Sequence, residues 1–149
     1  MRARLAALTP GERFVLVAGA LLIVDLLVLP WHDVPFNDAE RRAAVLLGFD
    51  PTPTGVQAPD SGYGIAAVAF TALLAAHVAL TRLLGVRVPQ PGVPWAMIHQ
   101  LAGVFVLVVL VFKLLRETAY LGVGAYLGLL AAMFVAYGGV VSRGDEPAP

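Results

Sequence analysis

Residues 63–84 read YGIAAVAFTALLAAHVALTRLL, and residues 95–115 read WAMIHQLAGVFVLVVLVFKLL. Each segment holds about 21 mostly apolar residues, which at about 1.5 Å of rise per residue gives an α-helix roughly 30 Å long. That length matches the hydrocarbon thickness of a lipid bilayer. Pro89, Pro91 and Pro94 separate the two segments, because proline interrupts a helix. The pair therefore predicts two transmembrane helices joined by a short turn.

The composition of the whole chain agrees with a membrane protein. Of its 149 residues 59% are apolar and 13% are charged, and the mean hydropathy is +0.82, whereas soluble domains carry about 25% charged residues. The length fits one domain. Ten basic residues balance ten acidic ones, so no net charge attracts nucleic acid. Cysteine is absent, which excludes disulfides, cysteine-ligated zinc, iron–sulfur clusters and thiol catalysis.

A further apolar run precedes these two segments. Thr9, Pro10 and Glu12 form a helix-start pattern in which Thr9 is the cap, and the residues from 14 to 29 are apolar except for Asp25. A secretory signal peptide is the alternative interpretation, since basic residues come first. No small-residue cleavage site follows, so we expect a retained transmembrane helix over about residues 12–30.

Residues 31–62 form the one sizeable polar segment. Asn37 and Glu40 have the spacing of a capping box, which predicts a short helix ending near Leu47. Its apolar and charged residues oppose one another, so this helix could lie flat on the membrane surface. The turn-rich residues 51–62 then lead to the next span. We expect a plain loop outside the membrane; a catalytic lid is the alternative.

Small residues mark helix contacts in two of the apolar segments. In the last one, over about residues 119–141, Gly124 and Gly128 form a GxxxG pattern, which is typical of close helix packing in membranes. In the first quoted segment, Ala72 and Ala76 belong to a stripe of small residues with the same property. We expect the glycines to pack within the chain, with a partner helix as the alternative.

The four segments predict an all-α, four-helix transmembrane bundle of up-down-up-down topology, with one longer extracytoplasmic loop that contains a short interfacial helix. Basic residues favour the cytoplasmic ends of spans. Placing both termini in the cytoplasm puts more of them inside (Arg2, Arg4, Arg13, Arg82, Arg87, Arg143) than outside (Arg41, Arg42, Lys113, Arg116). We therefore expect a multi-pass plasma-membrane protein with both termini cytoplasmic and a disordered tail over residues 142–149.

Asp25 and Lys113 are ionisable residues within the apolar segments, where a charge is costly unless it is paired. Each lies about five residues or fewer from the outer end of its span, so the two share a depth. This placement predicts a salt bridge that pins two helices together. The functional alternative is a proton or ion site near the outer face, in a subunit of an oligomeric channel or transporter.

His77 and His99 lie on opposite sides of the prolyl turn, each roughly 8–10 Å into the membrane from the cytoplasmic side. Histidines at matched depth on adjacent helices could ligate haem b, as in a small b-type cytochrome. The alternative is an ordinary hydrogen bond between helices. His32 lies at the outer surface, too far away to join them.

Patterns of catalysis are missing elsewhere. The sequence has no phosphate-binding glycine loop, no G-x-S-x-G, no H-E-x-x-H and no paired carboxylates within an apolar segment. Asp33, Asp38 and Glu40 are read as solvated loop residues. We therefore expect no enzymatic activity and no resident metal or cofactor. The favoured function is that of a structural or accessory component that packs with other membrane proteins or with itself in the bilayer.

Two stretches, LLIVDLLVLPWHDV (21–34) and GVGAYLGLLAAMFVAYGGVVSRGDE (122–146), carry a resemblance. Together they are similar to small four-helix integral membrane proteins of actinobacteria. The resemblance covers the first and last apolar segments and implies four membrane spans. Its motifs are compositional, so it implies no activity and no functional residue.

Overall fold

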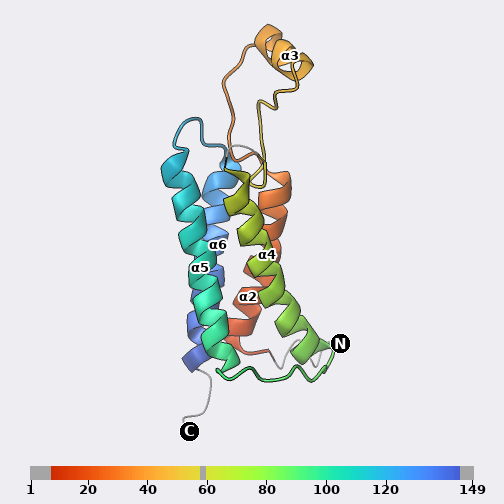
Figure 1. The fold of residues 1–149 in the computed structure, drawn as a ribbon, viewed down its shortest axis with the longest axis vertical. Helices are drawn as coiled ribbons and strands as arrows, with labels where there is room; N and C mark the ends of the chain where they lie inside the picture. Colours follow the sequence, from red (N-terminus) through yellow and green to blue (C-terminus); the bar gives the residue numbers. More distant parts are fainter. Residues whose placement is uncertain (1–7, 58–59, 145–149) are drawn as a thin grey trace.

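The computed structural model describes residues 8–57 and 60–144, and the fold is all-α, as expected (Figure 1). Within these residues the helices are, in chain order, α2 (Pro10–Val28), α3 (Asp38–Leu46), α4 (Ser61–Val78) with its π-helical continuation η1 (Ala79–Leu83), α5 (Trp95–Arg116) and α6 (Val123–Gly144). Both expected capping boxes are confirmed, with Thr9 and Glu12 at the start of α2 and Asn37 and Glu40 at the start of α3.

Four long helices lie side by side as a bundle and run alternately in opposite directions (Figure 1). α6 packs along both α2 and α5, and α4 packs against the same two helices. The order around the bundle is therefore α2, α4, α5, α6, with α6 closing on α2. We call the end at which α2 begins and α6 ends the inner end, and the opposite end, which carries α3, the outer end.

Three helical stretches are long and apolar enough to cross a membrane: Ser61–Leu83, Trp95–Arg116 and Val123–Ser142. The expected first span forms the helix α2, but among the described residues α2 is not one of these candidates. The physical reason is its charge content, because Glu12, Arg13 and Asp25 all fall within its 19 residues. Of the four expected spans, three are candidates by length and composition, and the first expected span forms a helix of the same bundle.

The start and end of α6 differ from the expected bounds of 119–141. Tyr120 has a φ of 52° and so interrupts the helix, while Gly122 and Gly124 donate backbone hydrogen bonds to the carbonyls of Trp31 and Pro30. The loop before α6 therefore pairs with the segment after α2. At the other end α6 continues to Gly144, into the expected tail; residues 145–149 of that tail, like Arg2 and Arg4, lie outside the described residues.

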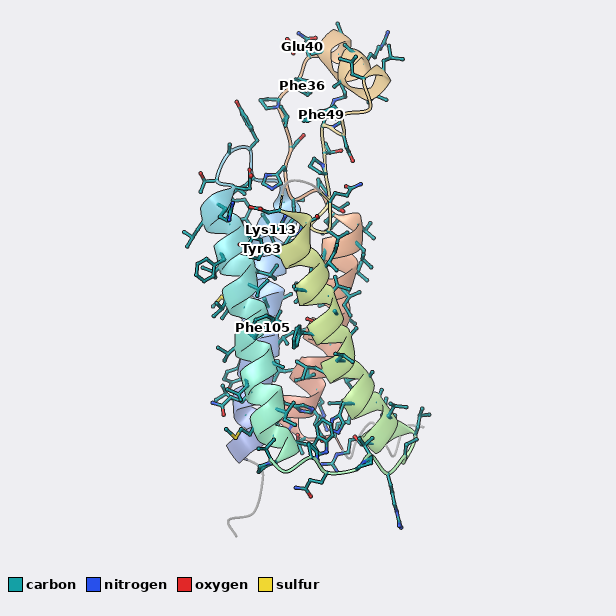
Figure 2. All side chains as sticks on the ribbon, in the orientation of Figure 1. Phe36, Glu40, Phe49, Tyr63, Phe105 and Lys113 are labelled. Carbon is teal, nitrogen blue, oxygen red and sulfur yellow. The ribbon has the colours of Figure 1, made fainter. Side chains whose placement is uncertain are left out.

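α3 stands away from the bundle on two extended segments (Figure 1). Phe36 and Phe49 meet edge to face at its base, with ring centroids 6.3 Å apart (Figure 2). Leu46 and Leu47 are almost fully exposed. The short helix thus exists where the capping box predicts it; Ala44 is buried, whereas the larger apolar residues Val45 and Leu46 remain uncovered.

Gly124 and Gly128 pack within the chain. A methyl group on Gly124 would meet the carbonyl oxygen of Pro30 at 2.8 Å and the Trp31 ring at 2.9 Å. A methyl group on Gly128 would meet the Trp31 ring at 2.5 Å and would also collide with Asp25. The GxxxG face of α6 is therefore occupied by the outer end of α2 and the indole that follows it.

Candidate functional site

His77 of α4 and His99 of α5 are in direct contact near the inner end. The distance from His77 Nδ1 to His99 Nε2 is 2.9 Å, and the two rings are nearly perpendicular with centroids 4.9 Å apart. Trp95, one turn before His99, stacks on the His77 ring at a centroid distance of 3.8 Å. His99 is only 4% exposed. One imidazole therefore donates a hydrogen bond to the other across the α4–α5 interface.

Glu12 and Arg82 form an ion pair beside the histidines. Arg82 Nε donates to Glu12 Oε1 at 2.6 Å, and the other carboxylate oxygen accepts from the Thr9 backbone N–H at 2.9 Å. The Glu12 side chain is 10% exposed and that of Arg82 57%. The pair links α2 to the end of α4, and the capping carboxylate predicted from sequence thus has a second role.

The π-helical turn η1 brings Arg82 to this position. Its backbone hydrogen bonds join residues five positions apart rather than four, as in the 3.0 Å bond from Leu84 N–H to Ala79 O. The Thr81 hydroxyl donates to the His77 carbonyl at 2.8 Å, which occupies an acceptor of the preceding turn. π-helical turns are frequent at functional sites, because they change the direction in which side chains point.

Two cavities meet at these side chains, which we name the inner-end site (Glu12, His77, Arg82, Trp95, His99). A polar cavity of about 320 Å³ is lined by all five, with Thr9, Thr81, Gln90 and Ser142 among its other walls. An apolar cavity of about 410 Å³ lies between α4 and α5 and is lined by residues such as Phe70, Leu74, Ile98 and Ala102. His77, Trp95 and His99 line both cavities.

Haem between His77 and His99 does not fit this arrangement. Two axial imidazoles lie on opposite faces of a haem, and a metal–nitrogen distance of about 2.0–2.1 Å on each side would hold the nitrogens about 4 Å apart. Here the nitrogens are 2.9 Å apart and the ring centroids 4.9 Å, which leaves no space for a planar macrocycle. The described part of the chain also contains no group of three His, Asp or Glu side chains suited to a metal.

A second buried polar group, the outer-end cluster, consists of Asp25, Trp31 and Lys113. The Trp31 indole N–H donates to Asp25 Oδ2 at 3.0 Å, and Lys113 Nζ lies 5.9 Å from the centroid of the Trp31 ring. The exposed fractions are 4%, 0% and 1% in that order. Lys113 also donates to the Asp60 carbonyl at 3.3 Å, near the level of Tyr63 (Figure 2).

The expected salt bridge between Asp25 and Lys113 is not among the ion pairs of residues 8–57 and 60–144. Instead, Asp25 accepts a hydrogen bond from the Trp31 indole, and Lys113 Nζ lies 5.9 Å from the centroid of the same ring. Residue counts suggested a shared depth for the two residues, but they did not anticipate the indole. Asp25 faces Trp31 and Gly128 in the protein interior.

The sequence interpretation missed four site residues. Trp31 and Trp95 were read as segment boundaries, although they lie six residues from Asp25 and four from His99, and a buried indole usually finds a hydrogen-bond partner or a stacked ring nearby. Glu12 was read only as a cap, and Arg82 only as a basic flank. His32 lies apart from the other histidines, as expected, with Nδ1 3.2 Å from the Ala119 carbonyl oxygen.

No family model, no curated protein and no solved structure matches the chain. The class is therefore defined by the molecule itself. It is an all-α bundle with three candidate membrane-spanning helices and two buried polar clusters, one near each end.

Proposed function

We propose that this chain is a non-enzymatic, four-span protein of the plasma membrane, with both termini cytoplasmic, that acts as an accessory component by packing against a second membrane helix. α2 is the fourth span in this proposal. Its Glu12 and Asp25 are buried, so they are shielded from lipid in the way that intramembrane charges require. Beyond Arg13 at its inner end, α2 turns apolar side chains outward, among them Val17, Leu21, Val24, Leu27 and Val28.

The observation that carries the accessory role is the outward face of α4. Gly64, Ala67, Thr71 and Leu74 face the bundle interior, whereas Ala69, Ala72 and Ala76 are exposed. Small side chains let a neighbouring backbone approach closely, and this close packing drives helix association where lipid is as apolar as the helix. Since Gly124 and Gly128 are already used within the chain, the alanine face of α4 is the small-residue face that we assign to another helix.

Ala72→Leu tests this role, because the larger side chain would keep a second helix from approaching α4. The full chain is produced in native membranes, treated with a membrane-permeant cross-linker, and purified in mild detergent with the co-purified proteins identified by mass spectrometry. Ala20→Leu is the matched control, since Ala20 is an exposed alanine on α2. We expect a cross-linked complex, either homo- or hetero-oligomeric, that Ala72→Leu loses and Ala20→Leu keeps.

Two results would contradict the proposal. The first is a strictly monomeric native protein with no cross-linked partner. The second is a complex that both leucine variants retain in equal amount, because the partner would then bind elsewhere.

A further inference from the structure

The inner-end site has the form of a binding site for an amphiphile. Its polar and apolar cavities are each within the size range of small-molecule sites, about 300–1,000 Å³. They share His77, Trp95 and His99, so a ligand seated against these rings would have polar groups on one side and apolar side chains on the other. That change of polarity lies within about two helical turns of the inner end of α4.

His77 has a hydrogen-bonding atom without a partner. Its Nε2 is buried and makes no hydrogen bond, although Nδ1 is engaged with His99. In either neutral tautomer Nε2 requires a partner: it is an acceptor if Nδ1 donates and a donor if Nδ1 accepts. An unsatisfied buried polar atom is destabilising, because it has lost its hydrogen bonds to water without gaining another partner. A ligand head that forms a hydrogen bond with Nε2 would therefore satisfy this atom and stabilise the bound state relative to the empty site.

The charges around the polar cavity favour a neutral head. Among the described residues that line it, Glu12 and Arg82 are the charged ones, and they neutralise one another at 2.6 Å. The hydrogen bond between His77 and His99 requires one ring nitrogen without a proton. An anionic head would be repelled by the Glu12 carboxylate, and a cationic head would be repelled by the Arg82 guanidinium.

The apolar cavity is suited to one hydrocarbon chain. Phe70 of α4 packs on Phe105 of α5 at a centroid distance of 4.6 Å, and Figure 2 shows Phe105 between these two helices. This contact bridges α4 and α5 on the outer side of the site. Leu73 and Leu80, which also line the cavity, are exposed on the surface of the bundle. A chain could therefore enter from the bilayer.

We propose that the inner-end site binds a neutral, single-chain amphiphile with a carbonyl-bearing head, the chemistry of a prenylated quinone. The head lies in the polar cavity, where His77 Nε2–H donates to a carbonyl oxygen, and the chain lies in the apolar cavity. In this tautomer His77 Nδ1 accepts the hydrogen bond from His99. The proposal concerns binding alone and does not require a partner protein.

Tryptophan fluorescence tests this binding, because the chain has two tryptophans at opposite ends of the bundle. The probe is a decyl-substituted benzoquinone, titrated into the purified full chain in lipid nanodiscs. Trp31→Phe leaves Trp95 as the one emitter, and Trp95→Phe leaves Trp31. We expect saturable quenching of Trp95 and only weak, linear quenching of Trp31, which reports partition of the probe into lipid.

Two substitutions in the Trp31→Phe background test the two halves of the site. His77→Phe keeps an aromatic ring against Trp95 but removes Nε2, and we expect about tenfold weaker binding from the lost hydrogen bond. Ala102→Phe narrows the apolar cavity without adding an emitter, and we expect it to abolish the saturable phase. Ala20→Phe on the exposed face of α2 is the matched control and should bind like the parent.

Several outcomes would overturn the proposal. Linear quenching of equal slope at both tryptophans would mean partition without a site. Unchanged affinity in His77→Phe would mean that the imidazole does not bind the head of the ligand. Competition by decanol as strong as by the quinone would mean that the carbonyl head is not recognised, and tighter binding of decanoate would mean that an anionic head is preferred.

Discussion

Replacing Gly128 by alanine measures how tightly α6 packs on the outer-end cluster. The added methyl group would lie 2.5 Å from the Trp31 ring and would collide with the Asp25 carboxylate. Overpacking of this kind costs about 1–3 kcal/mol, whereas alanine gains at most about 1 kcal/mol over glycine in a helix. We therefore expect Gly128→Ala to lower the free energy of unfolding by about 1–2 kcal/mol.

Gly62→Ala is the matched control, because Gly62 is a helical glycine of α4 with no atom within 4 Å of the added methyl group. It should leave the stability unchanged or raise it by up to about 1 kcal/mol. Both variants are unfolded with sodium dodecyl sulfate in mixed micelles, and helix content is followed by circular dichroism. Equal stabilities for Gly128→Ala and Gly62→Ala would refute the packing described for α6.

Three further predictions address the two clusters and the topology. Trp31→Phe should lower the free energy of unfolding by about 1.5–3 kcal/mol, because it removes the hydrogen-bond donor to the buried Asp25 carboxylate. In the same detergent titration, adding Asp25→Asn should recover part of the lost stability. No recovery would count against an ionised Asp25. His99→Phe should cost about 1 kcal/mol through the lost hydrogen bond to His77, and a neutral result would mean that the two rings are not bonded. The chain has no cysteine, so Asp50→Cys should react with a membrane-impermeant maleimide on intact cells, whereas Gln90→Cys should react only after permeabilisation; the reverse pattern would invert the proposed orientation.

The bounds of the helices were predictable because their signals are local. Thr9 and Asn37 each cap a helix with an acidic residue three positions later, and proline ends or separates helices on either side of the long apolar segments. The start of α6 was not predictable in this way. It depends on Tyr120 and on hydrogen bonds to residues 30 and 31, which are distant in sequence.

The sequence predicted how far along the bundle each cluster lies, but not the direction in which its side chains point. Counting residues at 1.5 Å each placed His77 level with His99 and Asp25 level with Lys113, and the structure brings the first pair into contact. The rotation of each helix about its own axis cannot be counted from one sequence, since it follows from the packing of all the others. For Asp25 and Lys113 that rotation leaves room for Trp31, which contacts both.

The π-helical winding of η1 has a consequence for how variants of this chain behave. A π-helical turn holds more residues than an α-helical one, so the chain turns less between Val78 and Arg82 than an α-helix would. Within that looser winding Arg82 donates to Glu12 and ties the end of α4 to the start of α2. Rewinding the segment as a regular helix would change the direction of the Arg82 side chain and so weaken this ion pair, while the packing of α4 along α2 would remain. The Thr81 hydroxyl, which donates to the His77 carbonyl, is a side-chain contact within the same turn.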